Sequence, residues 1–465
     1  MTLAVTPPPT LSRRVADRAA RPVDVASLAA FRIVFGLMMF SGIVRFLGTG
    51  WIKPMYADPH FFFHYPGFGW VVPWSPAGMY VHYCVLAALA LMIAAGAWTR
   101  IVTPLFTLGF AYTQLIDVTN YLNHHYLVVL LGALLSVLPA HRAWSVDAWR
   151  KPALRLDVVP AWTVWLLRFQ VGVVYVFAGL AKAQSDWLVH AQPLNIWLSA
   201  RTETPWIGHW LDTRWAAYAM SWGGFLFDTT IVLWMSWRRT RPVAFAVLVG
   251  FHVVVGYLFN IGMFPFIMIT SALIFFPPDW PRRLVAWLPV GASPPPTTTT
   301  AVTSPRVVPR WLGALLVLHV VVQVALPLRH FVYPGDVLWN EDGMRFSWQV
   351  MIREKHGSVN YVVHFADGRK LEVPPSEYLT SRQEREMSGQ PDLIAQLGRR
   401  IADDMREAGH GDVVVTVENT VSLNGRDPIP MIDPTVDLAH LRDLGPRWWV
   451  TPAPVGPPVH LRPRR

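Results

Sequence analysis

Long apolar runs separated by short polar connections occupy most of the chain before residue 330. Several of these runs approach the roughly 20 residues that an α-helix needs to cross a hydrocarbon core. We therefore predict eight or nine transmembrane helices, because two of the runs are short enough to be tilted or re-entrant segments. The runs cover residues 26–47, 77–97, 101–118, 125–140, 161–183, 215–236, 241–260, 263–277 and 311–329.

Basic residues cluster in alternate connections between the runs, which is typical of loops that face the cytoplasm. The other loops, near 49–75, 119–124 and 184–214, carry far fewer basic residues for their length. This alternation predicts a cytoplasmic N-terminus and an extracytoplasmic position for everything after the last run. The residues that set it are Arg13, Arg14, Arg18, Arg21, Arg100, Arg142, Arg150, Lys151, Arg155, Arg238, Arg239, Arg241, Arg282, Arg283, Arg306 and Arg310.

The pattern changes after the last apolar run. Residues 360–365 (NYVVHF) and 369–373 (RKLEV) resemble strands and flank Asp367-Gly368, which is a strong hairpin signal. Residues 382–408 are typical of a polar helix, and 412–418 of a further strand. A small α+β or sandwich-like domain is therefore expected here.

The predicted fold is a polytopic α-helical membrane protein followed by a small extracytoplasmic β-rich α+β domain. Low-complexity and polar segments set several of the boundaries between its parts. The parts are a cytoplasmic N-terminal segment 1–25, a transmembrane helical domain 26–289, a Pro/Thr-rich linker 290–310, a last transmembrane helix 311–329, a soluble domain 330–450 and a disordered tail 451–465.

Composition supports the membrane class. Of 465 residues, 53% are hydrophobic and only 15% are charged, which is unlike a soluble globular protein. A net charge of +10 is also found in nucleic-acid-binding proteins, but here the arginines lie beside the ends of apolar runs, so no nucleic-acid binding is expected. Cys84 is the only cysteine, which excludes an intrachain disulfide and a cysteine-rich zinc site.

Lys182 lies near the end of the apolar run VGVVYVFAGLAK at 171–182. An ammonium group is costly inside a membrane, so a lysine at this place is a functional candidate. Removal from water favours the neutral amine, which can act as a general base. The alternative is a lysine whose long side chain extends to the lipid headgroups.

Other polar residues gather near the predicted extracytoplasmic helix ends, where they could converge on one site. They are Asp117, Asn120, Asn123, His124, His125, Lys182, Asp186 and Asn260. A second set lies in or near the spans and is expected to form supporting ion pairs or hydrogen bonds, because buried charges persist only when paired. These residues are Arg32, Arg45, Arg168, Asp228 and His252.

The adjacent pair His124-His125 is a poor two-ligand metal site, because neighbouring side chains on a helix point in different directions. No further metal-ligand spacing lies nearby, so no metal is expected. A single imidazole that donates a hydrogen bond or carries a proton is the better interpretation.

Taken together, several segments resemble the vitamin K-dependent γ-glutamyl carboxylase family, including its bacterial members, over about residues 26–440. The order and spacing of these segments carry the resemblance. They are FRIVFG at 31–36, NHHYL at 123–127, WSVD at 144–147, LRFQVGVVYVFAGLAKAQSDW at 167–187, FNIGMFPF at 259–266, PPDWPRR at 277–283, FSWQVM at 346–351 and IDPTVD at 432–437.

The resemblance implies an enzyme that uses reduced vitamin K, O2 and CO2 to convert protein glutamate into γ-carboxyglutamate, with release of vitamin K epoxide. Lys182 matches the family base that deprotonates the hydroquinone. Addition of oxygen would then produce an alkoxide strong enough to remove the γ-proton of glutamate. His124 matches a histidine implicated in the carboxylation half. The candidates for the quinone pocket are Asn123, Phe259, Asn260, Met263, Phe264 and Met351.

The chain departs from the animal enzymes at three points. They have two consecutive lysines where this chain has Ala181-Lys182, they carry a disulfide between their two parts, and their C-terminal region is longer. The expected protein substrate is a glutamate-containing exported protein or peptide, and the expected location is the bacterial inner membrane. Two alternatives stay open: quinone epoxidation without carboxylation, and a non-enzymatic membrane binding or transport protein on the same scaffold.

Overall fold

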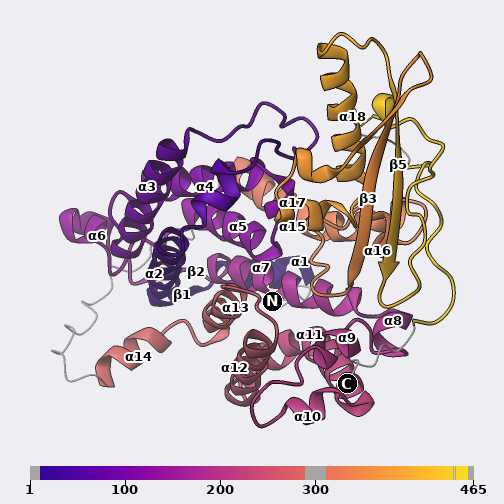
Figure 1. Ribbon diagram of the computed structural model, residues 1–465. Helices are drawn as coiled ribbons and strands as arrows, with labels where there is room; N and C mark the ends of the chain where they lie inside the picture. Colours follow the sequence, from indigo (N-terminus) through magenta and orange to yellow (C-terminus); the bar gives the residue numbers. More distant parts are fainter. Residues whose placement is uncertain (1–10, 288–309, 443–444, 446, 459–465) are drawn as a thin grey trace, which may run out of the picture.

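The computed structural model describes residues 11–287, 310–442, 445 and 447–458. Figure 1 shows a body of helices and, beside it, a domain in which helix α18 runs along strands β3 and β5. Residues 290–309 of the predicted linker and the last tail residues, 459–465, lie outside the described residues.

Each predicted span coincides with a helix of the body. The apolar runs therefore located these elements, although their ends shift by a few residues. The helices are α2 (Ala26–Gly48), α3 (Pro76–Ala95), α4 (Thr99–Leu115), α5 (Asn123–Val137), α7 (Trp162–Ala181), α11 (Arg214–Ser236), α12 (Arg241–Leu258), α13 (Phe264–Ala272) and α15 (Arg310–Leu328).

Five helices in the described part of the chain are long and apolar enough to cross a membrane: α2, α3, α7, α12 and the segment Trp311–Val332 that contains most of α15. Two shorter apolar helices, Asn123–Val137 and Phe264–Phe275, correspond to predicted spans that were already short. Helices α4 and α11 are not among these five, because each fails the length or the hydropathy requirement. The protein is therefore a helical membrane protein.

The core of the body lies among α2, α3, α4, α5 and α7, where Phe35, Phe106 and Leu131 are buried. Helices α2 and α3 approach closely at Gly36, where a Cβ atom would lie only 2.5 Å from the Ala94 backbone nitrogen. A side chain at this position would therefore force the two helices apart.

The C-terminal domain is built on a three-stranded antiparallel sheet in the order β4-β3-β5, with bounds Lys355–His364 for β3, Lys370–Val373 for β4 and Val414–Leu423 for β5. The turn between β3 and β4 contains Gly368 at a positive φ of 86°, which confirms the predicted hairpin. In the register, Tyr361 is paired with Val373 on one side and Val417 on the other.

Two predictions for this domain need correction. The polar helix expected at 382–408 is two helices, α17 (Ser381–Met387) and α18 (Pro391–Glu407), because Pro391 cannot continue the first and instead begins the second. The named strands of the domain form one sheet with helices packed on it, so the domain is α+β, the sandwich alternative is wrong and "β-rich" overstates the strand content.

The tail was expected to be disordered from Thr451, but its described residues, 451–458, contact the domain. The Thr451 amide donates to the Met431 carbonyl at 2.9 Å, and Arg426 Nε donates to the Gly456 carbonyl at 3.0 Å. The prediction was based on the Pro- and Arg-rich composition of this segment. Composition does not reveal hydrogen bonds to residues elsewhere in the domain.

Shorter elements connect the main ones. Strands β1 and β2 pair antiparallel and join the N-terminal segment to the start of α7. The remaining bounds are α1 (Leu11–Ala20), β1 (Pro22–Asp24), α6 (Val146–Arg150), β2 (Val158–Pro160), α8 (Ser185–Leu188), α9 (Leu194–Ser199), α10 (Gly208–Leu211), α14 (Trp280–Trp287) and α16 (Val337–Asn340).

Candidate active site

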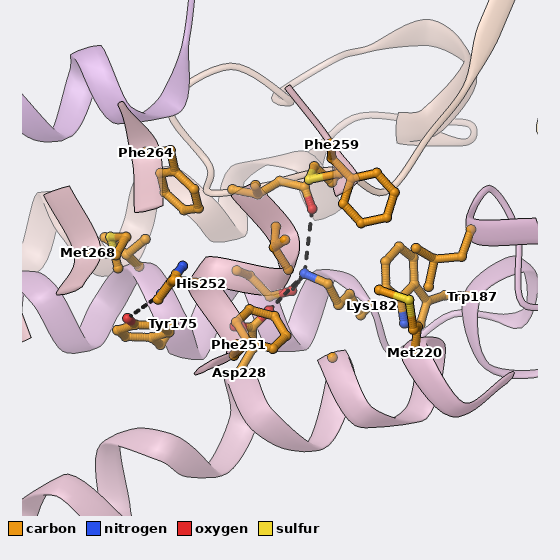
Figure 2. Close-up of a pocket in the computed structure, with 17 residues that line it drawn as sticks. Tyr175, Lys182, Trp187, Met220, Asp228, Phe251, His252, Phe259, Phe264 and Met268 are labelled. Atoms are coloured by element: carbon orange, nitrogen blue, oxygen red, sulfur yellow. Dashed lines mark hydrogen bonds and ion pairs between the residues drawn. The ribbon is translucent and has the colours of Figure 1, made fainter. Parts of the chain in front are cut away.

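A cavity with about 610 Å³ of empty space, part of it open to the surroundings, lies where α7, α11, α12 and α13 meet (Figure 2). Its walls are mostly apolar and aromatic, and Lys182, Asp228 and His252 are the acidic and basic side chains among them. The lining residues are Val174, Tyr175, Ala178, Lys182, Trp187, Leu194, Met220, Gly224, Asp228, Phe251, His252, Val255, Phe259, Phe264, Met268, Val350 and Met351.

Lys182 is the C-cap residue of α7, and its side chain turns back along the helix. Its Nζ donates to the Ala178 carbonyl at 3.1 Å and to Asp228 Oδ2 on α11 at 2.9 Å. The two side chains of this ion pair are only 7% and 9% exposed. Lys182 therefore does not extend to the lipid headgroups; it is held inside the protein with a carboxylate as its partner.

The backbone at Gly179 allows this ion pair to form. A Cβ atom there would lie 2.6 Å from Thr229 Cγ2 and 2.8 Å from the Thr229 nitrogen, so only glycine permits this approach of α7 to α11. Thr229 follows Asp228 in sequence, and Gly179 lies about one helical turn before Lys182. Close helix packing thus sets the distance between amine and carboxylate.

The C-terminal domain supplies one wall of the cavity. The Val350 carbonyl lies 3.5 Å from Lys182 Nζ, and Met351 also lines the cavity. Phe346, Trp348 and Met351 in this segment have positive φ angles of 63°, 58° and 53°, which are strained for bulky side chains. Trp348 is buried and stacks on Tyr126 of α5, which holds the strained segment in place.

A second polar pair lies along the same cavity. Tyr175 Oη on α7 and His252 Nε2 on α12 are 2.8 Å apart. The His252 ring lies among Phe251, Phe264 and Phe227, at centroid distances of 5.4, 5.8 and 6.1 Å. This imidazole is therefore enclosed by aromatic rings and has a fixed orientation.

The structure brings part of the predicted quinone pocket together with the predicted base. Phe259, Phe264 and Met351 line the cavity that contains Lys182 (Figure 2). Sequence proximity to Lys182 could not have indicated this, because Phe259 and Phe264 lie in one distant segment and Met351 lies in another.

The other three predicted pocket residues lie outside the cavity lining. Asn260 is exposed, just beyond the end of α12. Met263 packs toward α2, where its Cε would lie 3.6 Å from a Cβ atom on Gly42. Asn123 accepts a hydrogen bond from Tyr121 Oη at 2.9 Å. Their place in a matching motif did not determine which way their side chains point.

His124 lies in the first turn of α5 and is buried. It does not line the cavity, but its ring centroid is 6.0 Å from that of Phe264, which does. His124 is thus separated from the Lys182 cavity by one aromatic ring. The neighbouring His125 instead has its Nδ1 2.7 Å from Gln114 Oε1.

Two carboxylates that were expected at a common polar site instead attach the C-terminal domain to the helical body. Asp117 accepts a hydrogen bond from Gln383 Nε2 at 2.9 Å. Asp186 accepts from Asn424 Nδ2 at 2.8 Å and is paired with Arg426 at 2.6 Å. Burial alone would raise the pKa of Asp186, but the hydrogen bonds from Arg426 and Asn424 outweigh it and lower that pKa.

We expect Arg426→Ala to destabilise the protein by about 3–5 kcal/mol, because it leaves the Asp186 carboxylate, 9% exposed, without its charged partner. Thermal unfolding in detergent would measure the change. The folded-state pKa of Asp186 is lowered, so this stabilisation is complete above the ordinary aspartate pKa and is lost as pH falls through the lowered value.

Arg369→Ala is the matched control, because Arg369 pairs with Asp367 at the surface, where the side chains are 70% and 51% exposed. It should leave the unfolding temperature unchanged. Equal unfolding temperatures for Arg426→Ala and the wild type would show that the Asp186 contact does not hold the domain in place.

Several lining residues were not identified as site residues from sequence. Asp228 and His252 were expected only to support the fold, while Tyr175, Trp187 and Phe251 received no role. One local signal existed for Tyr175, which lies seven residues before Lys182 and so on the same face of α7. The residues of α11 and α12 carried no such signal, because their position depends on how the helices pack.

Comparison with known families covers both parts of the molecule. Residues 20–280 match the HTTM domain, a membrane domain, and residues 308–455 match the vitamin K-dependent gamma-carboxylase lumenal domain. No solved structure matches the chain. The first match spans most of the helical body, the second spans α15 and the C-terminal domain, and the two follow each other in one chain. The protein therefore belongs to the vitamin K-dependent γ-glutamyl carboxylase family.

Proposed function

We propose that this protein carboxylates glutamate residues of an exported protein or peptide to γ-carboxyglutamate, with coupled epoxidation of reduced vitamin K. The observation that carries the proposal is the Lys182 amine, buried in an apolar cavity of a chain that belongs to the carboxylase family. A lipid-soluble naphthohydroquinone would enter such a cavity from the bilayer. The amine is the group that would take the first proton.

The cavity residues fit a naphthohydroquinone. Trp187, Phe251, Phe259 and Phe264 offer aromatic surfaces for a fused ring system. His252 Nδ1 is buried and makes no hydrogen bond within the described part of the chain, so it is available to a ligand oxygen. The apolar walls would also keep water away from a strongly basic intermediate.

A bound hydroquinone would supply, through its reaction with O2, the strong base that no side chain can provide. The protein's part is to take and hold a proton. In the proposed step, Lys182 in its amine form removes the hydroxyl proton, and Asp228 Oδ2, 2.9 Å away, stabilises the resulting ammonium ion. Val350 and Met351 cover the amine from the side of the C-terminal domain.

The test is incubation of the purified protein with reduced vitamin K, labelled bicarbonate and a glutamyl peptide. Labelled peptide together with vitamin K epoxide supports the proposal. Epoxide without labelled peptide would favour a quinone epoxidase that has lost carboxylation. Absence of both products would favour a non-enzymatic binding or transport protein.

We further propose that the C-terminal domain faces the extracytoplasmic side of a bacterial inner membrane. Basic residues cluster in the connections assigned to the cytoplasm, and the Lys182 end of α7 adjoins the C-terminal domain. An exported peptide would then reach the cavity without crossing the bilayer.

A periplasmic reporter fused after residue 440 should therefore be active, and residues 340–440 should be digested by protease added to intact spheroplasts. A cytoplasmic reporter fused at the same position serves as the control and should be inactive. Activity of the cytoplasmic fusion alone, or protection of residues 340–440, would reverse the proposed orientation.

A further inference from the structure

His252 carries a buried nitrogen without a partner. Its Nδ1 makes no hydrogen bond to any described residue, although the side chain is almost wholly buried. An unpaired polar atom inside a protein is costly, and such atoms are rare unless water or a ligand satisfies them. The atom belongs to a residue that lines the Lys182 cavity.

The contact with Tyr175 assigns the tautomer of His252. Within the described part of the chain, the Tyr175 hydroxyl has His252 Nε2 as its hydrogen-bond partner, 2.8 Å away. We assign the phenol proton to this hydrogen bond, because no other acceptor for it lies within the described part of the chain; Nε2 is then the unprotonated acceptor. In the neutral ring the proton then lies on Nδ1, so the unpartnered atom is a hydrogen-bond donor.

The position of this donor relative to Lys182 matches a ligand with two oxygens. Lys182 Nζ turns back to the Ala178 carbonyl, so it lies near the level of Ala178 along α7. Tyr175, which orients His252, is three residues earlier, or about 4.5 Å along the helix axis. The two polar groups therefore lie at different levels along α7 and line the same cavity, an arrangement suited to a ligand with two oxygens.

We propose that His252 Nδ1–H donates a hydrogen bond to one ring oxygen of the naphthohydroquinone, while Lys182 faces the oxygen at the opposite end of the same ring. This inference rests on the proposed function, because it takes the quinone as the ligand of the cavity. His252 is a binding residue in this arrangement. It fixes which hydroxyl faces the amine, and Tyr175 positions the imidazole.

The aromatic surroundings support a ligand oxygen as the partner. Phe251 and Phe264 contact the imidazole ring, and Phe227 stacks on Phe251 at 3.9 Å, so the ring cannot turn toward another polar side chain without repacking them. A donor held in this way in an apolar cavity is suited to a ligand with a single acceptor at that place.

Binding measurements with two matched ligands test the proposal without any turnover. The probes are 2-methyl-1,4-naphthoquinone, which has two ring oxygens, and 2-methyl-1-naphthol, which has one. In detergent, the wild-type protein should bind the first about three- to tenfold more tightly, since one net hydrogen bond is worth roughly that factor. In His252→Leu this preference should fall to near one, with little change for the naphthol.

Two further variants keep the result interpretable. His252→Gln retains an N–H donor and should recover part of the preference if His252→Leu alone fails to fold. His82→Leu is the control, because His82 on α3 contacts the Gly109 carbonyl at 3.0 Å and does not line the cavity. It should retain the full preference.

Equal weakening of both ligands in His252→Leu would overturn the proposal, because it would show that the imidazole only packs the cavity wall. Wild-type protein that binds both ligands equally would overturn it as well. If neither ligand binds the wild type, both this inference and the quinone site of the proposed function fail. If the preference depends on His252 but no labelled peptide forms in the carboxylation assay, only the proposed carboxylation fails.

Discussion

Lys182→Ala should abolish epoxide formation, with a loss of at least about 10²-fold, the lower end of the contribution of a positioned general base. The reason is that the Lys182 amine is the basic group within the cavity that the proposal assigns to the first proton transfer. Lys182→Arg should fail to the same extent, because a guanidinium group stays protonated. The measurement is vitamin K epoxide formed per protein at saturating hydroquinone.

The ion pair with Asp228 makes a folding control necessary. Lys182→Ala leaves the Asp228 carboxylate, 9% exposed, without its partner, which costs about 3–5 kcal/mol when a buried pair is broken. The double variant Lys182→Ala/Asp228→Asn removes both charges and should restore the unfolding temperature while staying inactive. Partial recovery of turnover with a small added amine would identify the missing group as a base. Near-normal epoxidation by Lys182→Ala would refute the assignment.

The elements of the fold could be predicted because they depend on local pattern. The apolar run at 161–183 became α7, and the Asp367-Gly368 turn became the hairpin between β3 and β4. Lys182 could also be singled out, since a lysine within such a run is costly whatever the tertiary structure. Its partner could not: Asp228 is 46 residues away, and the Val350 carbonyl is 168 residues away.

The polar residues near the helix ends show where local reasoning stops. Asp117, Asp186 and Lys182 shared the same pattern, a polar group beside an apolar run. The two carboxylates bind Gln383 and Arg426 of the C-terminal domain, whereas Lys182 remains in the cavity. Sequence identified the residues that needed a partner, and only the packing of the domain on the helical body determined which partner each one has.

This domain packing also has a functional consequence. Because Val350 and Met351 form one wall of the cavity, any movement of the C-terminal domain relative to α7 alters the surroundings of Lys182. The contacts of Asp117 and Asp186 fix that position. Under the proposed function, a peptide bound to the domain would therefore be held at a fixed position relative to the cavity.

His124→Ala should separate the two half-reactions, with epoxide still formed and carboxylated peptide much reduced. Its imidazole lies outside the Lys182 cavity and is separated from it by the Phe264 ring, at 6.0 Å between centroids, so its loss leaves the first proton transfer intact. The measurement is the ratio of γ-carboxyglutamate to epoxide under saturating bicarbonate. His125→Ala is the matched control. The His125 ring centroid is 4.6 Å from that of His124, but the His125 side chain contacts Gln114. The ratio of γ-carboxyglutamate to epoxide in this variant should equal that of the wild type. Equal loss of both products in His124→Ala would instead indicate that this histidine supports the quinone site or the packing around Phe264.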